Sequence, residues 1–147
     1  MTDGLEVVEI SATDTHDLRR SVLRWNTPTK EVVFAEDEWP GCWHLGLRRD
    51  DTLVAVCSWV PRPHHEQPAV QLRGMATDRS LQGTGLGGML LERGCRIAHE
   101  RGFTLVWARA RDAALAFYER HGFTVEGDGF IDQATQMPHH VITRALG

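Results

Sequence analysis

Cysteine is scarce in this 147-residue sequence, and long apolar runs are missing. The three cysteines, Cys42, Cys57 and Cys95, are widely spaced and contain no CxxC pair. This pattern disfavours both a disulfide framework and a thiolate metal site, so we expect reduced, buried thiols. No stretch approaches the roughly 18 apolar residues that a membrane-spanning helix requires.

An excess of basic residues is also missing. Lysine and arginine total 16 against 20 aspartate and glutamate residues, which gives a net charge of −4. A nucleic-acid-binding surface needs clustered basic residues, so this balance disfavours a nucleic-acid partner. The opening residues MTDGLEVVEI lack a basic segment followed by an apolar run, which disfavours a secretion signal. We expect a cytoplasmic protein that acts on small molecules and has no nucleic-acid or membrane partner.

The remaining composition is that of a globular protein. Hydrophobic residues make up 41% of the chain and charged residues 24%, which disfavours disorder. The length corresponds to one ordinary domain, so we predict a single domain over residues 1–147.

Hydrophobic periodicity predicts an α/β chain without internal repeats. Strand patterns occupy residues 5–10, 42–47, 53–60, 69–77, 104–109, 123–126 and 141–145. Helical patterns occupy residues 14–25, 84–101 and 113–120. Thr13 or Asp14 is expected to cap the first helix, and Asp112 the last. Residues 26–41 show no period and contain two prolines, which is typical of a long loop that carries specificity.

The stretch LQGTGLGG, residues 81–88, precedes a helical pattern and fits two phosphate-binding motifs. Read from Gly83 it is GxGxxG, typical of dinucleotide-binding folds, and read from Gln82 it is QxxGxG, typical of acyl-CoA binding. In a dinucleotide fold the strand runs almost directly into the first glycine, but ATDRSLQ intervenes here and too little chain follows. A Walker loop is excluded because Met89 stands where lysine is required. We favour the acyl-CoA motif, with nicotinamide-dependent redox chemistry as the weaker alternative.

Together with this motif, two further segments resemble the GNAT superfamily of N-acetyltransferases. They are QLRGMAT, residues 71–77, and DAALAFYERHGF, residues 112–123. The tail GDGFIDQATQMPHH, residues 127–140, looks like that of small stand-alone bacterial members. The resemblance spans most of the chain.

The resemblance implies a fold and an activity. The fold would be α+β, with a mixed, mostly antiparallel sheet of six or seven strands, about four flanking helices, and strands splayed at the cofactor site. The activity would be transfer of an acetyl group from acetyl-CoA to a primary amine by direct attack, without a covalent enzyme intermediate and without a metal. The acceptor would be a small-molecule or peptide amine. Dimerisation is common in such folds, so a homodimer is also an expectation.

The glycine spacing has a physical reason. The first amides of a helix lack intrahelical partners and its dipole favours anions, so a pyrophosphate can bind there. Gln82 stands where relatives often have arginine, and Arg111 where many have a cofactor-binding asparagine. Arg111 could instead meet a phosphate. By resemblance, the cofactor-binding residues are Met75, Ala76, Thr77, Gln82, Gly83, Thr84, Gly85, Leu86, Gly87, Gly88, Arg111 and Tyr118.

Tyr118 is the candidate general acid. It is the only tyrosine of the chain, and AFYERHGF resembles the family segment whose tyrosine hydroxyl reaches the coenzyme sulfur. A phenol is protonated at neutral pH and can donate to the departing thiolate. The resemblance also implies that a main-chain amide near Met75 polarises the thioester carbonyl. Alternatively, Tyr118 is an aromatic anchor between helix and sheet, a role that Phe117 beside it could also fill.

The general base has no such signature, because strand 69–77 lacks the glutamate that some relatives use. His139 and His140 precede the final strand pattern, and since adjacent strand residues face opposite ways, at most one would point into the site. His44 and His16 are further candidates, and a water relay is an alternative.

Three other expectations concern the acceptor and metals. Gln71 and Arg73 share the polar face of strand 69–77 and are expected to bind the acceptor or to form a buried hydrogen-bond network. The acidic balance of the chain favours a cationic acceptor. No metal site formed by His64 and His65 with His139 and His140 is expected, because adjacent histidines do not easily converge on one ion and solvated loop histidines are commoner. The alternative to an enzyme is a non-catalytic acyl-CoA binding or sensing module on the same fold.

Overall fold

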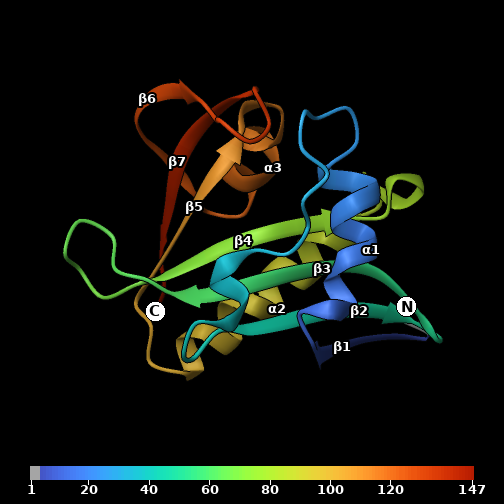
Figure 1. The fold of residues 1–147 in the computed structure, drawn as a ribbon. Helices are drawn as coiled ribbons and strands as arrows, with labels where there is room; N and C mark the ends of the chain where they lie inside the picture. Colours follow the sequence, from blue (N-terminus) through green and yellow to red (C-terminus); the bar gives the residue numbers. More distant parts are fainter. Residues whose placement is uncertain (1–3) are drawn as a thin grey trace.

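The computed structural model, described for residues 4–147, contains a seven-stranded sheet with helices on both faces (Figure 1). The strands are β1 (Leu5–Ile10), β2 (Trp43–Arg49), β3 (Thr52–Pro61), β4 (Val70–Thr77), β5 (Leu105–Arg111), β6 (Thr124–Ile131) and β7 (Pro138–Ala145). The α-helices are α1 (His16–Leu18), α2 (Leu86–Glu100) and α3 (Leu115–Arg120). The shorter helical turns are η1 (Thr13–Thr15), η2 (Arg19–Leu23), η3 (Ala35–Glu38), η4 (Arg79–Leu81) and η5 (Asp112–Ala114).

The strand order is β1-β2-β3-β4-β5-β7-β6, in which β4 and β5 run parallel and the other neighbours antiparallel. This mixed, mostly antiparallel α+β architecture confirms the predicted fold class. Residues 4–147 contain three α-helices rather than about four, because the other helical segments are short 3₁₀ or π turns. None of the helices in this part of the chain is long and apolar enough to cross a membrane.

Helices on opposite faces of the sheet use alternate residues of the same strand. In Figure 1, α2 lies behind the sheet and α1 in front of it. Cys57 and Trp59 of β3 belong to the core cluster that includes α2, whereas Val56 packs with Leu18 of α1. A Cβ at Gly94 of α2 would lie 2.1 Å from the Trp59 ring. Only glycine lets the helix pack this closely on the sheet.

The predicted thiols are free, and burial differs among them. Cys57 and Cys95 are buried as expected, while Cys42 is half-buried. Burial raises the pKa of the Cys57 thiol to about 12 and that of Cys95 to about 11. Neither forms the thiolate that nucleophilic chemistry would need.

The first helical segment differs from the single regular helix expected over residues 14–25. The chain passes through η1 and α1 into the π-helical turn η2. Ser11 caps its start, because the Asp14 amide donates to the Ser11 hydroxyl and the Ser11 amide donates to the Asp14 carboxylate, each at 3.2 Å. A cap at Thr13 was therefore wrong, and Asp14 acts only as the reciprocal partner of Ser11.

The last strand begins earlier than the expected residue 141. β7 starts at Pro138, and within it His139 pairs with Arg111 and His140 with Ala110 of β5. Both histidines are therefore fixed in the sheet rather than standing before it.

Pairing between β4 and β5 is confined to the start of β4, at Val70 and Gln71. Further along, the register with β3 skips Gly74 and Met75, and Gly74 has a φ of +60°. Glycine at positive φ accommodates such a bulge, which bends the strand and interrupts its ladder. From Gln71 to Met75, β4 lines a cavity together with β5.

Candidate active site

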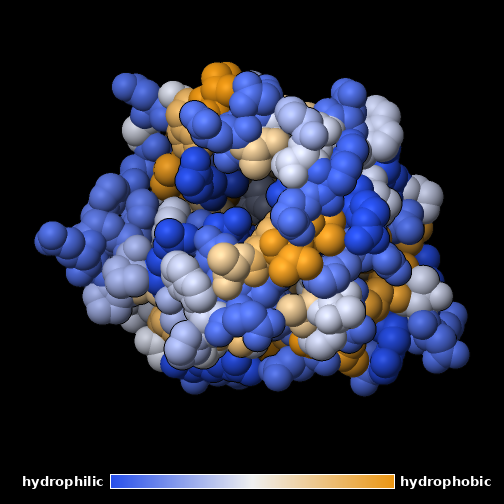
Figure 2. Space-filling view, in the orientation of Figure 1, coloured by the Kyte–Doolittle hydropathy of each residue, from blue (hydrophilic) through white to orange (hydrophobic). Residues whose placement is uncertain are grey.

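Two adjoining cavities lie along β4 and β5. The glycine-loop cavity, about 820 Å³, is lined by Val22, Met75, Thr77, Gln82, Gly83, Gly85, Gly87, Gly88, Met89, Glu92, Arg111, Ala113, Ala114, Phe117, Tyr118, Arg120 and His121. The arginine cavity, about 330 Å³, is lined by Leu23, Arg24, Phe34, Gln71, Leu72, Arg73, Gly74, Met75, Ala108, Arg109, Ala110, Arg111, Ala114, Tyr118, Asp132, Ala134, Thr135 and His139. Both cavities share four residues: Met75, Arg111, Ala114 and Tyr118. Figure 2 shows this face of the molecule hollowed near its middle, with hydrophilic residues on either side.

The glycine loop enters α2 through left-handed backbone. Gly83 and Gly85 have φ of +82° and +88°, and no atom lies within 4 Å of a Cβ added to either. The backbone conformation, rather than lack of space, therefore requires glycine at both positions. Gln82 supports the turn, because its Nε2 donates to the Thr77 carbonyl at 3.2 Å. The loop leaves the first amides of α2 free toward the cavity.

Three of the predicted cofactor residues have side chains engaged elsewhere. Ala76 packs in the cluster of α1, and Leu86 in the core cluster of α2. The Thr84 hydroxyl donates to the Leu81 carbonyl. Only the backbone of these residues could serve a ligand in the glycine-loop cavity.

Tyr118 lies at the shared wall of the two cavities with 8% of its surface exposed. Its ring packs edge-on against Phe117 and Phe123, with centroids 5.0 and 5.5 Å away. Burial raises the pKa of the Tyr118 hydroxyl well above its ordinary value, so the phenol keeps its proton at neutral pH. This position is compatible with both roles considered for Tyr118, an aromatic anchor between helix and sheet and a proton donor to the departing thiolate.

His139 and His140 lie on opposite faces of β7, as strand alternation requires. His139 is 6% exposed and lines the arginine cavity, and its Nδ1 lies 2.9 Å from the Met137 carbonyl. A carbonyl can only accept, so Nδ1 carries the proton and Nε2 of the neutral ring has a free lone pair. His140 lines neither cavity, and its Nδ1 lies 2.7 Å from Asp112 Oδ1.

Several other polar residues singled out in the sequence make structural contacts. Asp112 does not cap the helix after β5, because η5 starts without a side-chain cap and the carboxylate binds His140 instead. His44 Nδ1 lies 2.7 Å from the Ser58 hydroxyl. Neither His44 nor His16 lines either cavity.

His64 and His65 do converge, contrary to the argument from their adjacency. Their Nε2 atoms lie 2.8 and 2.7 Å from Glu126 Oε1. His65 has a φ of +49°, in a turn closed by backbone hydrogen bonds between His64 and Gln67. The hydrogen bond from His65, joined by that of His64, lowers the pKa of Glu126. The cluster lines neither cavity, and the absence of a metal stays a prediction.

Gln71 and Arg73 line the arginine cavity and also join a hydrogen-bond network. Glu36 Oε2 accepts from Arg73 Nη1 at 2.8 Å and from Arg62 Nη1 at 3.3 Å. Arg62 Nη1 also donates to Gln71 Oε1 at 3.2 Å. Because Glu36 lies in η3, this network connects the loop of residues 26–41 to β4.

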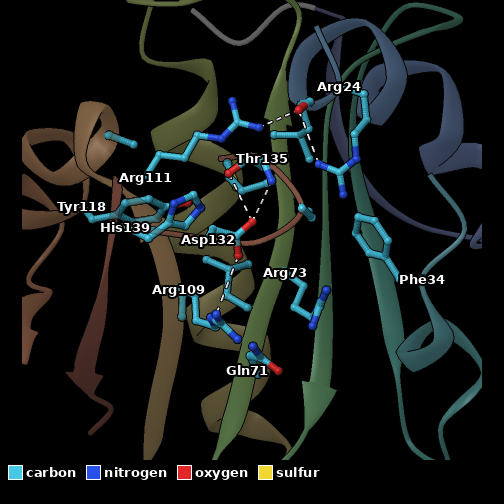
Figure 3. A pocket seen from close by; sticks show the side chains of 18 residues that line it. Arg24, Phe34, Gln71, Arg73, Arg109, Arg111, Tyr118, Asp132, Thr135 and His139 are labelled. Carbon is cyan, nitrogen blue, oxygen red and sulfur yellow. Dashed lines mark hydrogen bonds and ion pairs between the residues drawn. The ribbon is translucent and has the colours of Figure 1, made fainter. Parts of the chain in front are cut away.

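The arginine cavity is positively charged. Arg24, Arg73, Arg109 and Arg111 line it, against the carboxylate of Asp132 (Figure 3). The excess of positive charge in this cavity contrasts with the net charge of −4 for the whole chain. The cavity therefore gives no support to the expected cationic acceptor.

Several residues that line the arginine cavity belong to no sequence motif: Arg24, Phe34, Arg109 and Asp132. Phe34 lies in the long loop of residues 26–41, where the sequence predicts specificity residues without naming them. Gly74 within a strand pattern was the available signal of a bulge next to the site.

The sequence matches a family model and a protein of known family. The sequence model of the acetyltransferase (GNAT) family matches residues 9–123. The uncharacterized N-acetyltransferase YitI of Bacillus subtilis (strain 168) is 32% identical over 129 residues, which cover 86% of this chain and 87% of YitI.

Solved structures share the fold over nearly the whole chain. An acyl-CoA N-acyltransferase from Pseudomonas aeruginosa has a TM-score of 0.80 at 24% identity, covering 96% of this chain and 99% of that one. ElaA of Escherichia coli has a TM-score of 0.78 at 17% identity, covering 95% and 99%. PaiA N-acetyltransferase from Thermoplasma acidophilum, solved in complex with coenzyme A, has a TM-score of 0.73 at 16% identity, covering 96% and 98%. The family match and the relationship to YitI confirm the predicted family: the chain belongs to the GNAT family and is a GNAT-type N-acetyltransferase.

Proposed function

We propose that the chain transfers an acetyl group from acetyl-CoA to a primary amine by direct attack on the thioester. The observation that carries this proposal is the wall shared by the two cavities, formed by Met75, Arg111, Ala114 and Tyr118. A thioester in the glycine-loop cavity and an amine in the arginine cavity would meet there. No serine or cysteine of residues 4–147 lines either cavity, which favours direct attack over a covalent intermediate.

The glycine-loop cavity suits the cosubstrate. The free amides at the start of α2 would bind the pyrophosphate, and the positive φ of Gly83 and Gly85 keeps this backbone open. The part of β4 after Gln71 is not paired with β5, so its backbone is available to bond the pantetheine amides as an added strand would. Bound acetyl-CoA would supply the acetyl group as an activated thioester.

Two groups of the shared wall would stabilise the transfer. Met75 lies at the bulge of β4, outside the register with β3, so its amide can donate to the developing oxyanion. The Tyr118 hydroxyl is protonated at neutral pH, as a phenol ordinarily is, and it would donate to the sulfur as the carbon–sulfur bond breaks.

His139 is the better of the two histidines for the base. Its Nε2 lone pair would accept the proton that the amine loses as the carbon–nitrogen bond forms. His140 lies outside both cavities and is engaged by Asp112. The proton taken by His139 passes to solvent, and Tyr118 regains one from solvent, so the cycle balances.

The experiment combines binding and turnover. Acetyl-CoA should raise the melting temperature, nicotinamide dinucleotides should not, and thiol release should depend on an added amine. Stabilisation by coenzyme A without amine-dependent thiol release across a broad panel would indicate a sensing module instead. Stabilisation by a nicotinamide dinucleotide alone would overturn acyl transfer altogether.

A matched pair of glycine variants tests the phosphate site. Gly85 and Gly102 both have left-handed φ, +88° and +95°, with nothing within 4 Å of an added Cβ, but Gly102 lies beyond the far end of α2. Gly85→Val and Gly102→Val should therefore lose similar stability through backbone strain. Only Gly85→Val should weaken coenzyme A binding in calorimetry. Equal affinities for the two variants would contradict the proposed site.

A further inference from the structure

Arg24 and Arg111 hold their guanidinium groups at the wall of the arginine cavity around one shared acceptor (Figure 3). Both donate to the Leu23 carbonyl, Arg24 through Nη1 at 3.4 Å and Arg111 through Nη2. Arg24 Nε also donates to the Glu31 carbonyl at 2.8 Å. Carbonyl groups carry no net charge, so these bonds orient the two cations without neutralising them.

Neither guanidinium has a carboxylate partner within residues 4–147. The ion pairs of the neighbouring arginines are Arg109 with Asp132 at 3.7 Å and Arg73 with Glu36 at 2.8 Å. Burial lowers the pKa of Arg24, and the positive charge of Arg111 lowers it further. Burial also lowers the pKa of Arg111, and the carboxylate of Asp132 acts in the opposite direction on both arginines without forming an ion pair with either.

Phe34 helps to orient Arg24 and Arg73. The guanidinium carbon of Arg24 lies 5.5 Å from the centroid of the Phe34 ring, and that of Arg73 lies 5.1 Å from the same ring. Cations over an aromatic face are attracted to it, so their orientation is set before any ligand binds. Guanidinium groups present several donors in a planar fork that matches a carboxylate or a phosphate.

We infer that the amine acceptor carries an anionic group, and that Arg24 and Arg111 bind this group. The inference rests on the proposed acetyl transfer and names its substrate class: amino acids and related aminoalkyl acids, with a carboxylate or a phosphonate as the shared chemistry. The amine of such an acceptor would lie in the cavity that Asp132 and His139 also line.

Arg24 distinguishes an acceptor site from a cofactor site. Arg111 borders both cavities, so it could also meet a phosphate of the cosubstrate. Arg24 lines the arginine cavity and not the glycine-loop cavity. A loss confined to the acceptor on changing Arg24 therefore separates the two ligands.

The test compares acids with their neutral counterparts. Glycine, β-alanine, 4-aminobutyrate and a set of α-amino acids are assayed beside the corresponding primary amides, with 2-aminoethylphosphonate beside β-alanine. For every active amine skeleton, kcat/KM should be about 10-fold to 100-fold higher for the acid than for the amide, as expected for hydrogen bonds to a charged group. A higher value for the phosphonate than for β-alanine would assign the site to phosphate-like groups.

The acid-over-amide ratio is kcat/KM for an acid divided by kcat/KM for its amide. Arg24→Gln should reduce this ratio by about tenfold while leaving the KM for acetyl-CoA unchanged. Arg24→Lys, which keeps the charge but loses the planar fork, should retain part of the ratio. The matched control is Arg20→Gln, because Arg20 lies in η2, the turn directly before Arg24, but lines neither cavity and pairs with Asp17 at 3.5 Å. This control should keep the full ratio.

The outcomes separate the inference from the function on which it rests. Acetylation of neutral amines and amides at rates equal to the acids would overturn the anionic acceptor and keep the acetyltransferase. Loss of acetyl-CoA affinity in Arg24→Gln, with the acid-over-amide ratio intact, would assign Arg24 to the cosubstrate instead. Failure to acetylate any amine, with coenzyme A bound, would overturn the proposed function itself. The comparison of acids with amides needs no variant, so it remains decisive even if Arg24→Gln fails to fold.

Discussion

Removing the carboxylate of Asp37 should strongly destabilise the protein, because it would leave a buried guanidinium without its counter-charge. Arg19 is 0% exposed, and its Nη1 and Nη2 atoms donate to the two oxygens of Asp37 at 2.8 and 2.9 Å. Its other contacts reach the Val32 carbonyl at 2.8 Å and the Ser58 hydroxyl at 2.9 Å. The Arg19–Asp37 pair thus connects η2 and η3 with each other, with the loop before η3, and with β3.

We expect Asp37→Ala to lower the free energy of unfolding by about 3–5 kcal/mol, the usual cost of breaking a buried ion pair from one side. The double variant Arg19→Met with Asp37→Leu should recover most of this loss, because it removes both charges together. Urea unfolding at neutral pH measures each variant. Arg48→Gln is the control, since its ion pair with Glu6 is exposed and should contribute less than about 1 kcal/mol.

Two results would refute this reasoning. A loss below about 1 kcal/mol in Asp37→Ala would mean that Arg19 finds solvent or another partner. A double variant as unstable as the single one would mean that packing, rather than charge, holds these elements together.

Acid should weaken the same pair. Burial acts to raise the pKa of Asp37, but the hydrogen bonds and charge of Arg19 outweigh it, and the pKa lies below its ordinary value. The stabilisation is therefore complete above the unfolded-state pKa of about 3.9 and is lost as the pH falls through the lower folded-state value. The difference in stability between wild type and Asp37→Asn should shrink below about pH 4, as measured by urea midpoints across pH. A constant difference would contradict the assignment.

Three further predictions concern catalysis and packing. Tyr118→Phe should reduce turnover about 10²-fold to 10⁴-fold with the KM for acetyl-CoA and the melting temperature little changed, and near wild-type turnover would remove Tyr118 as the acid. His139→Ala should lose the acidic limb of the pH–rate profile, because a general base must be unprotonated to act, while His140→Ala should keep this limb. An acidic limb preserved in both variants would indicate a water relay instead. Gly94→Ala should lower the free energy of unfolding by about 1–3 kcal/mol in urea, since overpacking outweighs the roughly 1 kcal/mol gained in helix propensity. Its Cβ would lie 2.1 Å from the Trp59 ring, and a stabilised variant would show that the helix can shift.

The parts of the site that depend on adjacent residues could be predicted from the sequence. The glycine loop is one of these, because the spacing of Gly83 and Gly85 ahead of a helix defines its free amides locally. Met75 and Tyr118 were predicted through resemblance, and the structure brings both to the shared wall. Their catalytic roles stay predictions.

The parts that depend on tertiary contacts could not be predicted. Arg24 reaches the cavity only because η2 lies against β4, and Asp132 only because β6 and β7 lie beside β5. The net charge of −4 for the whole chain does not report the charge of one cavity, and four arginines line this one. The positive φ of His65 and the bulge at Gly74 are backbone features that periodicity does not report.

The most direct test of acetyl transfer is mass spectrometry of the products formed from isotopically labelled acetyl-CoA and a mixture of amino acids and their amides. The structure predicts labelled N-acetyl amino acids in amounts equal to the coenzyme A thiol released. Release of thiol without any labelled amide bond, or binding of coenzyme A without either product, would contradict it.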